Sequence, residues 1–264
     1  MRARTEELLY LLLWSWDRLQ NPTWRNLDDS FEGWVYRKGL RRQLADLERR
    51  RFLESHPDLA EPRSPAPVLR LTQAGRLHAL GGRDPEAHWR RPWDGCWRLI
   101  IYDLPAGEGT KRNRLRNLLR SRGFGWLQKS VWVTPGPLDG GRVLLSEGPV
   151  NVQSLVVLEA RPIAGQTDAE IVAGAWDFLV INGLYAKHLE VLGRRPDGEV
   201  RGELAATALR DWSREERAAW LAAVSADPLL PQELHPTGYL GPKAWQARIA
   251  ALDQAARQVR SFRG

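Results

Sequence analysis

The sequence has a single cysteine, Cys96, among its 264 residues. An intrachain disulfide is therefore excluded, and so is a zinc site built from several cysteines of one chain. The five histidines give no substitute, because they are scattered without the spacing of metal ligands. We expect neither a structural metal nor a cofactor.

Long hydrophobic runs are also missing, since no apolar stretch approaches the roughly 18 residues that a membrane span requires. The N-terminal segment MRARTEELLYLLLWSWDR resembles a signal peptide in having basic residues before an apolar run. Its apolar run covers only Leu8–Trp14, acidic residues precede the run, and no small-residue cleavage site follows it. These features favour an amphipathic first helix and a cytoplasmic protein without membrane contact.

The sequence carries a formal charge of +7, and this charge is unevenly distributed. Residues 1–92 hold 17 Lys/Arg against 13 Asp/Glu, and residues 93–140 hold 8 against 4. Residues 141–264 hold 14 against 15. A basic first half beside a neutral second half is expected if the first half binds a polyanion.

Residues 1–82 show the pattern of a winged helix-turn-helix domain. Apolar residues in helical spacing predict a helix over residues 5–19, and a short helix is expected around Trp24–Ser30. A third helix has its leucines on one face, and it is followed by two predicted strands, one from Phe52-Leu53 and one over Val68–Thr72. Thr72 is expected to cap the next helix. Three helices and a two-stranded wing suit a helix in the major groove with phosphate contacts around it.

Basic and polar residues on the third helix and on the wing are the candidate DNA contacts. On the helix and just before it these are Tyr36, Arg37, Lys38, Arg41, Arg42 and Gln43, and on the wing they are Arg63 and Arg70. A solvated helix face would have the same composition, but this basic run lies directly before a hairpin, which favours DNA binding.

Residues 89–165 read as strand, helix, strand, strand, helix, strand, the order of a ferredoxin-like domain. The predicted elements are strands at 97–103, 124–127, 130–133 and 152–159, with helices at 110–122 and 138–145. Arg112, Arg116 and Arg120 form a basic stripe on the first of these helices. Such a stripe is usually solvated, but it is also suited to contacting phosphates or a neighbouring subunit.

Residues 166–264 are predicted to be mostly helical, with helices over 171–192 (continuous or broken), 204–223 and 244–262. The whole is thus an α+β protein of three domains, 1–82, 89–165 and 166–264. Four tryptophans of the last domain, Trp176, Trp212, Trp220 and Trp245, are expected to fill its core, and an aromatic pocket for a planar ligand is the alternative.

The run WDGCWRLIIYDLPAGEGTKRNRLRNLLRSRGFGWLQKSVWVTP resembles the central domain of the PaaX family of bacterial repressors. The later segments WDFLVINGLY and DPLLPQELHP resemble the C-terminal domain of that family. The resemblance implies a non-enzymatic transcriptional repressor that binds a palindromic double-stranded DNA operator as a homodimer. It also implies a central domain similar to the CRISPR adaptation nuclease-like subunit, and a small-molecule effector such as an aryl-CoA thioester.

Two other functions remain as alternatives. The first is a metal-dependent nuclease that uses Asp103, since a carboxylate at the end of a buried strand is suited to holding a divalent ion. The single carboxylate argues against it, and Asp103 is also placed to accept backbone N–H bonds from the following turn or to pair with an arginine of the basic helix. The second is an interaction protein that does not bind DNA.

Overall fold

The computed structural model describes residues 3–15, 39–56, 68–105, 107–138 and 154–259, and these fall into two compact units. The first unit comprises Met1–Asp84, Leu184–Ala222 and Gly241–Gly264, and the second comprises Pro85–Gly183 and Ala223–Leu240. This grouping differs from the three consecutive segments expected from the sequence, because the helices of the last segment contribute to both units.

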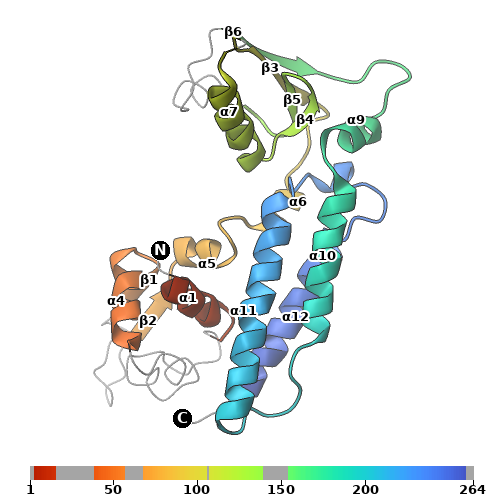
Figure 1. The fold of residues 1–264 in the computed structure, drawn as a ribbon. Helices are drawn as coiled ribbons and strands as arrows, with labels where there is room; N and C mark the ends of the chain where they lie inside the picture. The colour runs from red at the N-terminus through yellow and green to blue at the C-terminus, as the bar shows by residue number, and fades with distance from the viewer. Residues whose placement is uncertain (1–2, 16–38, 57–67, 106, 139–153, 260–264) are drawn as a thin grey trace. The chain divides into compact units, whose positions relative to one another are not determined.

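The N-terminal part of the first unit consists of three described helices and one hairpin (Figure 1): α1 (Ala3–Ser15), α4 (Leu40–Arg49), β1 (Leu53–His56), β2 (Val68–Leu71) and α5 (Gln73–Ala79). The two strands pair antiparallel from Leu53↔Leu71 to His56↔Val68. Thr72 caps α5 as predicted, since its hydroxyl accepts a 3.0 Å bond from the Gly75 N–H. The short helix expected at residues 24–30 lies outside the described residues, so the complete winged helix-turn-helix stays a prediction.

The middle of helix α1 is buried on all sides, whereas the sequence predicted an amphipathic helix. Leu8 to Leu12, including Tyr10, are each at most 1% exposed. The helix packs against α4, α5 and α12 (Gly241–Val259), which together cover its middle. One hydrophobic core therefore holds α1 together with the leucines of α4 and with residues of α11 (Gly202–Ala226) and α12.

The second unit contains a four-stranded antiparallel sheet in the order β4-β5-β3-β6. Its elements are β3 (Trp97–Asp103), α7 (Gly109–Ser121), β4 (Gly125–Gln128), β5 (Val131–Thr134) and β6 (Ser154–Ala160). The four strands match the predicted ones within two residues at each end, and their order is that of a ferredoxin-like sheet. The second helix expected for that fold, at residues 138–145, lies almost wholly outside the described residues.

Each face of this sheet is covered by a different layer. Ile100, Tyr102 and Trp132 face α7, where Leu115 and Leu119 complete the core. On the other face Trp97 and Val133 pack with α9 (Asp168–Ala175) and with residues near η3 (Gln232–Leu234). A short helix, α6 (Pro85–Trp89), precedes the sheet.

Helix α7 starts earlier than predicted, and the helix over 171–192 is interrupted, which is one of its two predicted forms. Helix α7 begins at Gly109, one residue before the predicted start, and its N-cap residue Glu108 makes no side-chain cap hydrogen bond. The predicted helix over 171–192 is broken into α9 and α10 (Phe178–Gly193), and the backbone is extended at Trp176. None of the described helices is both long and apolar enough to cross a membrane.

Candidate nucleic-acid interface

Helix α4 presents its arginines to solvent because its leucines are committed to the core. Leu40, Leu44 and Leu47 are each at most 4% exposed, and they lie on one face of the helix. Arg41 and Arg42 lie on the exposed face. Gly39 is the N-cap of this helix, and its φ of 138° lies in a region that residues other than glycine rarely adopt. Two of the predicted DNA contacts are therefore accessible from solvent.

Gln43 differs from these arginines, although it was included among the predicted DNA contacts. It is 5% exposed, and its Oε1 accepts a hydrogen bond from the Thr5 hydroxyl of α1. The side chain projects from α4 toward α1, because it lies three positions after the buried Leu40 and four before the buried Leu47, on the same face of the helix. Gln43 thus joins two helices, and we leave it out of the DNA-contacting set.

The wing contributes one described candidate, Arg70. It is exposed between the buried Leu69 and Leu71, and it stands opposite Glu54 in the β1–β2 register. The other four candidates, Tyr36, Arg37, Lys38 and Arg63, lie outside the described residues.

Three arginines at the end of α4 were missed as candidates, although the sequence shows them as a run. Arg49, Arg50 and Arg51 are all exposed, and Arg51 adopts a positive φ of 58°. Arg49 and Arg50 both bond to Asp46. Desolvation raises the pKa of the Asp46 carboxyl, but the bonds from Arg50 and Arg49 outweigh it and leave that pKa below its ordinary value. The carboxylate therefore stays ionised and offsets part of this positive charge.

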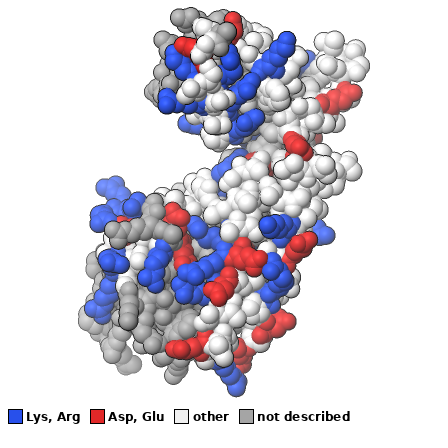
Figure 2. Space-filling model, in the orientation of Figure 1, with Lys and Arg blue, Asp and Glu red and all other residues white. Residues whose placement is uncertain are grey.

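Figure 2 shows Lys and Arg side chains gathered over α7 as well as over α4, yet the stripe on α7 is partly structural. Arg112 donates a 2.9 Å bond to the carbonyl of Leu104, which holds the turn after β3. Arg120 places its guanidinium 5.8 Å from the centre of the Trp132 ring. The basic stripe on α7 is thus a weaker candidate for phosphate contacts than the face of α4.

Asp103 is exposed at the end of β3, and its carboxylate has no hydrogen bond or ion pair in the described part of the chain. The expected pairing with the basic helix is not present, because Arg112 bonds the carbonyls of Leu104 and Pro105 instead. Among the described residues there is no group of three His, Cys, Asp or Glu that could hold a metal ion. The described residues therefore provide no set of metal ligands for the nuclease alternative.

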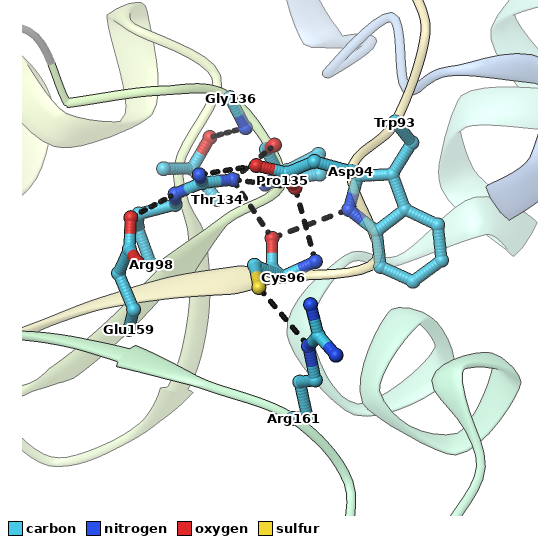
Figure 3. A network of polar contacts seen from close by, with 9 residues as sticks. All are labelled: Trp93, Asp94, Cys96, Arg98, Thr134, Pro135, Gly136, Glu159 and Arg161. Atoms are coloured by element: carbon cyan, nitrogen blue, oxygen red, sulfur yellow. Dashed lines mark hydrogen bonds and ion pairs between the residues drawn. The ribbon is translucent and has the colours of Figure 1, made fainter.

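The Trp-Asp-Gly motif before β3 builds a turn rather than a reactive site (Figure 3). Asp94 accepts a 3.0 Å bond from the Cys96 N–H, and Gly95 between them has a φ of 72°. Arg98 then bonds both Asp94 and Glu159, at 3.1 Å from its Nε to Glu159. The motif residues therefore fix the start of the central strand of the sheet.

Three of the four tryptophans of the last segment fill a core, as expected, and the fourth lines a cavity. Trp212, Trp220 and Trp245 are at most 8% exposed and belong to the interior of the first unit. Trp176 lies in the second unit and lines an open cavity.

Comparison with known proteins gives a match for the region that contains this sheet. Residues 90–172 match the family described as the PaaX protein central Cas2-like domain. This match confirms, for the central part of the chain, the resemblance seen in the sequence. No curated protein matches the chain. Among solved structures, the uncharacterized protein Rv0674 from Mycobacterium tuberculosis is 21% identical, with a TM-score of 0.46, over 83% of this chain and 81% of that one.

Proposed function

Because the chain carries a central domain of the PaaX family, we propose that it is a transcriptional regulator that binds double-stranded DNA. The arrangement of α4 and the β1–β2 hairpin carries this proposal, since the buried leucines of α4 leave Arg41 and Arg42 on its exposed face. Arg70 on the hairpin adds a positive charge suited to a phosphate contact. The excess of basic residues in the first half of the sequence supports the same function.

The finer assignment is a repressor that acts as a homodimer and is released by a small molecule such as an aryl-CoA thioester. It follows from the family resemblance. Half-sites about one helical turn apart, or a multiple of it, are the arrangement expected for a two-fold symmetric dimer.

Mapping of genomic occupancy is the primary test of this function. We expect sharp binding at palindromic sites, and their absence would favour the interaction protein that does not bind DNA. On an operator found in this way, Arg42→Ala is expected to weaken binding by about 1–3 kcal/mol if Arg42 contacts a base. Arg114→Ala on α7 is the matched control, because it removes an exposed arginine from the other unit. Equal affinity of wild type and Arg42→Ala would contradict this role of Arg42.

The nuclease alternative is tested by incubating the protein with duplex and single-stranded DNA in Mg²⁺ or Mn²⁺. We expect no cleavage that depends on Asp103. Cleavage by the wild type that is lost in Asp103→Asn would identify the protein as a nuclease and contradict the proposed regulator function.

A further inference from the structure

Helix α1 lies between the candidate DNA-contacting helix α4 and helix α11 (Figure 1). Helix α4 packs mainly against α1 and β1, so these two elements determine where its exposed face lies. All of them belong to the first unit, which combines Met1–Asp84 with helices from the last part of the chain. The placement of Arg41 and Arg42 therefore depends on what holds α1.

The apolar residues of α1 fill the core but specify its position poorly. Leu8, Leu9, Leu11 and Leu12 are all buried, and hydrophobic contacts are not directional. Identical buried side chains distinguish weakly between neighbouring registers of a helix. A polar group with a defined partner is the usual means of selecting one register.

Glu7 provides such a group between α1 and α11. Its two carboxylate oxygens accept bonds from Arg214, at 2.7 Å from Nε and 2.9 Å from Nη2, and Arg210 Nε lies at 3.2 Å. The Glu7 side chain is 11% exposed. Burial raises the pKa of the Glu7 carboxyl, but the bonds and charges of Arg214 and Arg210 outweigh it and leave that pKa below its ordinary value. An ionised pair with two parallel bonds is strong and directional, so it defines how α1 lies on α11.

Thr5 links the same helix to α4 on the other side. Its hydroxyl donates to the Oε1 of Gln43, and the two residues are 1% and 5% exposed. Thr5 and Glu7 are two positions apart in α1, so a shift of one moves the other. Gln43 directly follows Arg42 on α4, and its bond therefore restrains the direction in which the exposed arginines point.

We propose that Glu7 is a positioning residue for DNA binding, through which α11 orients the exposed face of α4. Arg210 and Arg214 hold Glu7, and the bond between Thr5 and Gln43 transmits the position of α1 to α4. The last part of the chain thereby contributes to DNA recognition through α1. This inference rests on the proposed function and adds to it residues outside the DNA-contacting set.

The ratio of operator affinity to affinity for unrelated duplex DNA tests this role, measured by fluorescence anisotropy on an operator found by occupancy mapping. Glu7→Gln keeps the size of the side chain and removes the charge that both arginines bind. We expect the ratio to fall about tenfold, because misdirected arginines lose directional base contacts and keep phosphate contacts. A variant that only folds less completely lowers both affinities equally, so its ratio stays unchanged.

Glu215→Gln is the matched control, because Glu215 lies on α11 and pairs at 2.6 Å with Arg194, which follows α10. This variant removes an ion pair of the same helix without touching the link to α1, so the ratio should stay as in the wild type. Charge reversal adds a rescue. Glu7→Arg should lower the ratio further, and Glu7→Arg/Arg214→Glu should restore most of it, since the double variant rebuilds the pair with its charges exchanged.

A second pair of variants tests the step from α1 to α4. Gln43→Met removes the acceptor of the Thr5 bond, keeps the length of the side chain and should lower the ratio by a similar factor. If Glu7 acts through this bond, Glu7→Gln/Gln43→Met should lower the ratio no more than either single variant. Additive losses, or an unchanged ratio in either single variant, would overturn the inference.

Hydrogen exchange of the free protein separates failure of this inference from failure of the proposed function. We expect the amides of α4 to exchange about tenfold faster in Glu7→Gln than in the wild type or in Glu215→Gln, because α1 supports α4 less firmly. A wild type without preference for any DNA sequence rejects the proposed function, and the exchange rates alone then decide whether Glu7 positions α4. Unchanged exchange of α4 in Glu7→Gln would show that it does not.

Discussion

The two units each contain a network of arginine and carboxylate groups, and the networks differ chiefly in burial. In the first unit Glu216 bonds Arg248 at 2.7 Å and His188 at 2.9 Å, and it accepts from the Tyr10 hydroxyl. The side chains of Glu216 and Arg248 are 0% and 2% exposed. In the second unit Arg98 is 10% exposed, but its partners Asp94 and Glu159 are 53% and 68% exposed (Figure 3).

This difference determines what happens when one partner is lost. An exposed carboxylate that loses its arginine is hydrated, so an exposed pair contributes little to stability. A buried carboxylate has no water to replace the lost partner, and its isolated charge is costly. The buried network also links distant parts of the sequence, because it joins Tyr10 of α1 to α10, α11 and α12.

The pKa directions in the buried network agree with this picture. Burial raises the pKa of Glu216, but the charge of Arg248 and the bonds from His188 and Tyr10 outweigh it and leave that pKa below its ordinary value. Burial and the charge of Glu216 raise the pKa of the Tyr10 hydroxyl well above its ordinary value. Glu216 is therefore ionised and Tyr10 is a proton donor across the neutral pH range.

The largest effect is expected from Arg248→Ala, which leaves an ionised Glu216 inside the core. It should lower the free energy of unfolding by about 3–5 kcal/mol, measured by urea denaturation. Part of the loss comes from the stacking of the guanidinium 4.8 Å from the Trp220 ring centre. The control is Arg257→Ala on the same helix, whose pair with Asp253 is exposed and should contribute at most about 1 kcal/mol.

If Arg248→Ala does not fold, the double variant Arg248→Met/Glu216→Leu keeps the comparison testable. Replacing both charges by apolar groups should restore folding, since buried ion pairs are often no more stabilising than apolar pairs. Equal destabilisation by Arg248→Ala and Arg257→Ala would show that burial does not separate the two kinds of pair.

A smaller effect is expected from Tyr10→Phe, which removes one bond to Glu216 and keeps the aromatic packing. Hydrogen bonds to charged groups contribute about 1.5–3 kcal/mol, so the free energy of unfolding should fall by that amount. Tyr102→Phe is the control, because Tyr102 is 3% exposed and its hydroxyl has no partner in the described part of the chain. That control should be neutral or slightly stabilising. A similar loss in both variants would mean that the Tyr10 bond adds nothing beyond packing.

The buried network marks the limit of what the sequence could predict. Periodicity located α1, but it predicted a solvent-facing side that α12 covers. Tyr10 and Glu216 are 206 positions apart in the sequence, so no local sequence pattern predicts their hydrogen bond. The strands of the second unit were predicted within two residues because a continuous apolar run and flanking glycines and prolines are local signals.

The candidate DNA contacts also show that local spacing predicts which residues share a face but not their partners in other helices. The leucine spacing of α4 was enough to place Arg41 and Arg42 on the exposed face. The role of Gln43 was not foreseen, because its hydrogen-bond partner is the hydroxyl of Thr5 in another helix. The cavity beside Trp176 was equally hidden, since its lining comes from segments between positions 120 and 236.

In the exposed network, Arg98→Met is expected to cost only about 1 kcal/mol, because both carboxylates are already accessible to water. Methionine keeps most of the apolar stem, so the packing of the side chain is retained. Part of the cost is the lost bond from Arg98 to the carbonyl of Cys96, at 3.1 Å. Urea denaturation of this variant beside Arg248→Ala compares the two networks directly. A loss as large as that of Arg248→Ala would contradict the role assigned to burial.

The smallest effect is the pH dependence carried by Asp94. The hydrogen bonds from Arg98, and then from the Cys96 N–H, outweigh desolvation and lower the pKa of Asp94 from 3.8 to about 2. Because the folded pKa lies below the unfolded one, this stabilisation is complete above about pH 4 and is lost as the pH falls toward 2. The stability difference between wild type and Asp94→Asn, from urea denaturation at each pH, should therefore be constant above about pH 5 and shrink between pH 4 and 2. In the Arg98→Met background the same substitution should lose most of this dependence, because the largest cause of the shift is absent. A pH dependence that persists unchanged in that background would assign the lowered pKa to the backbone turn instead of to the arginine.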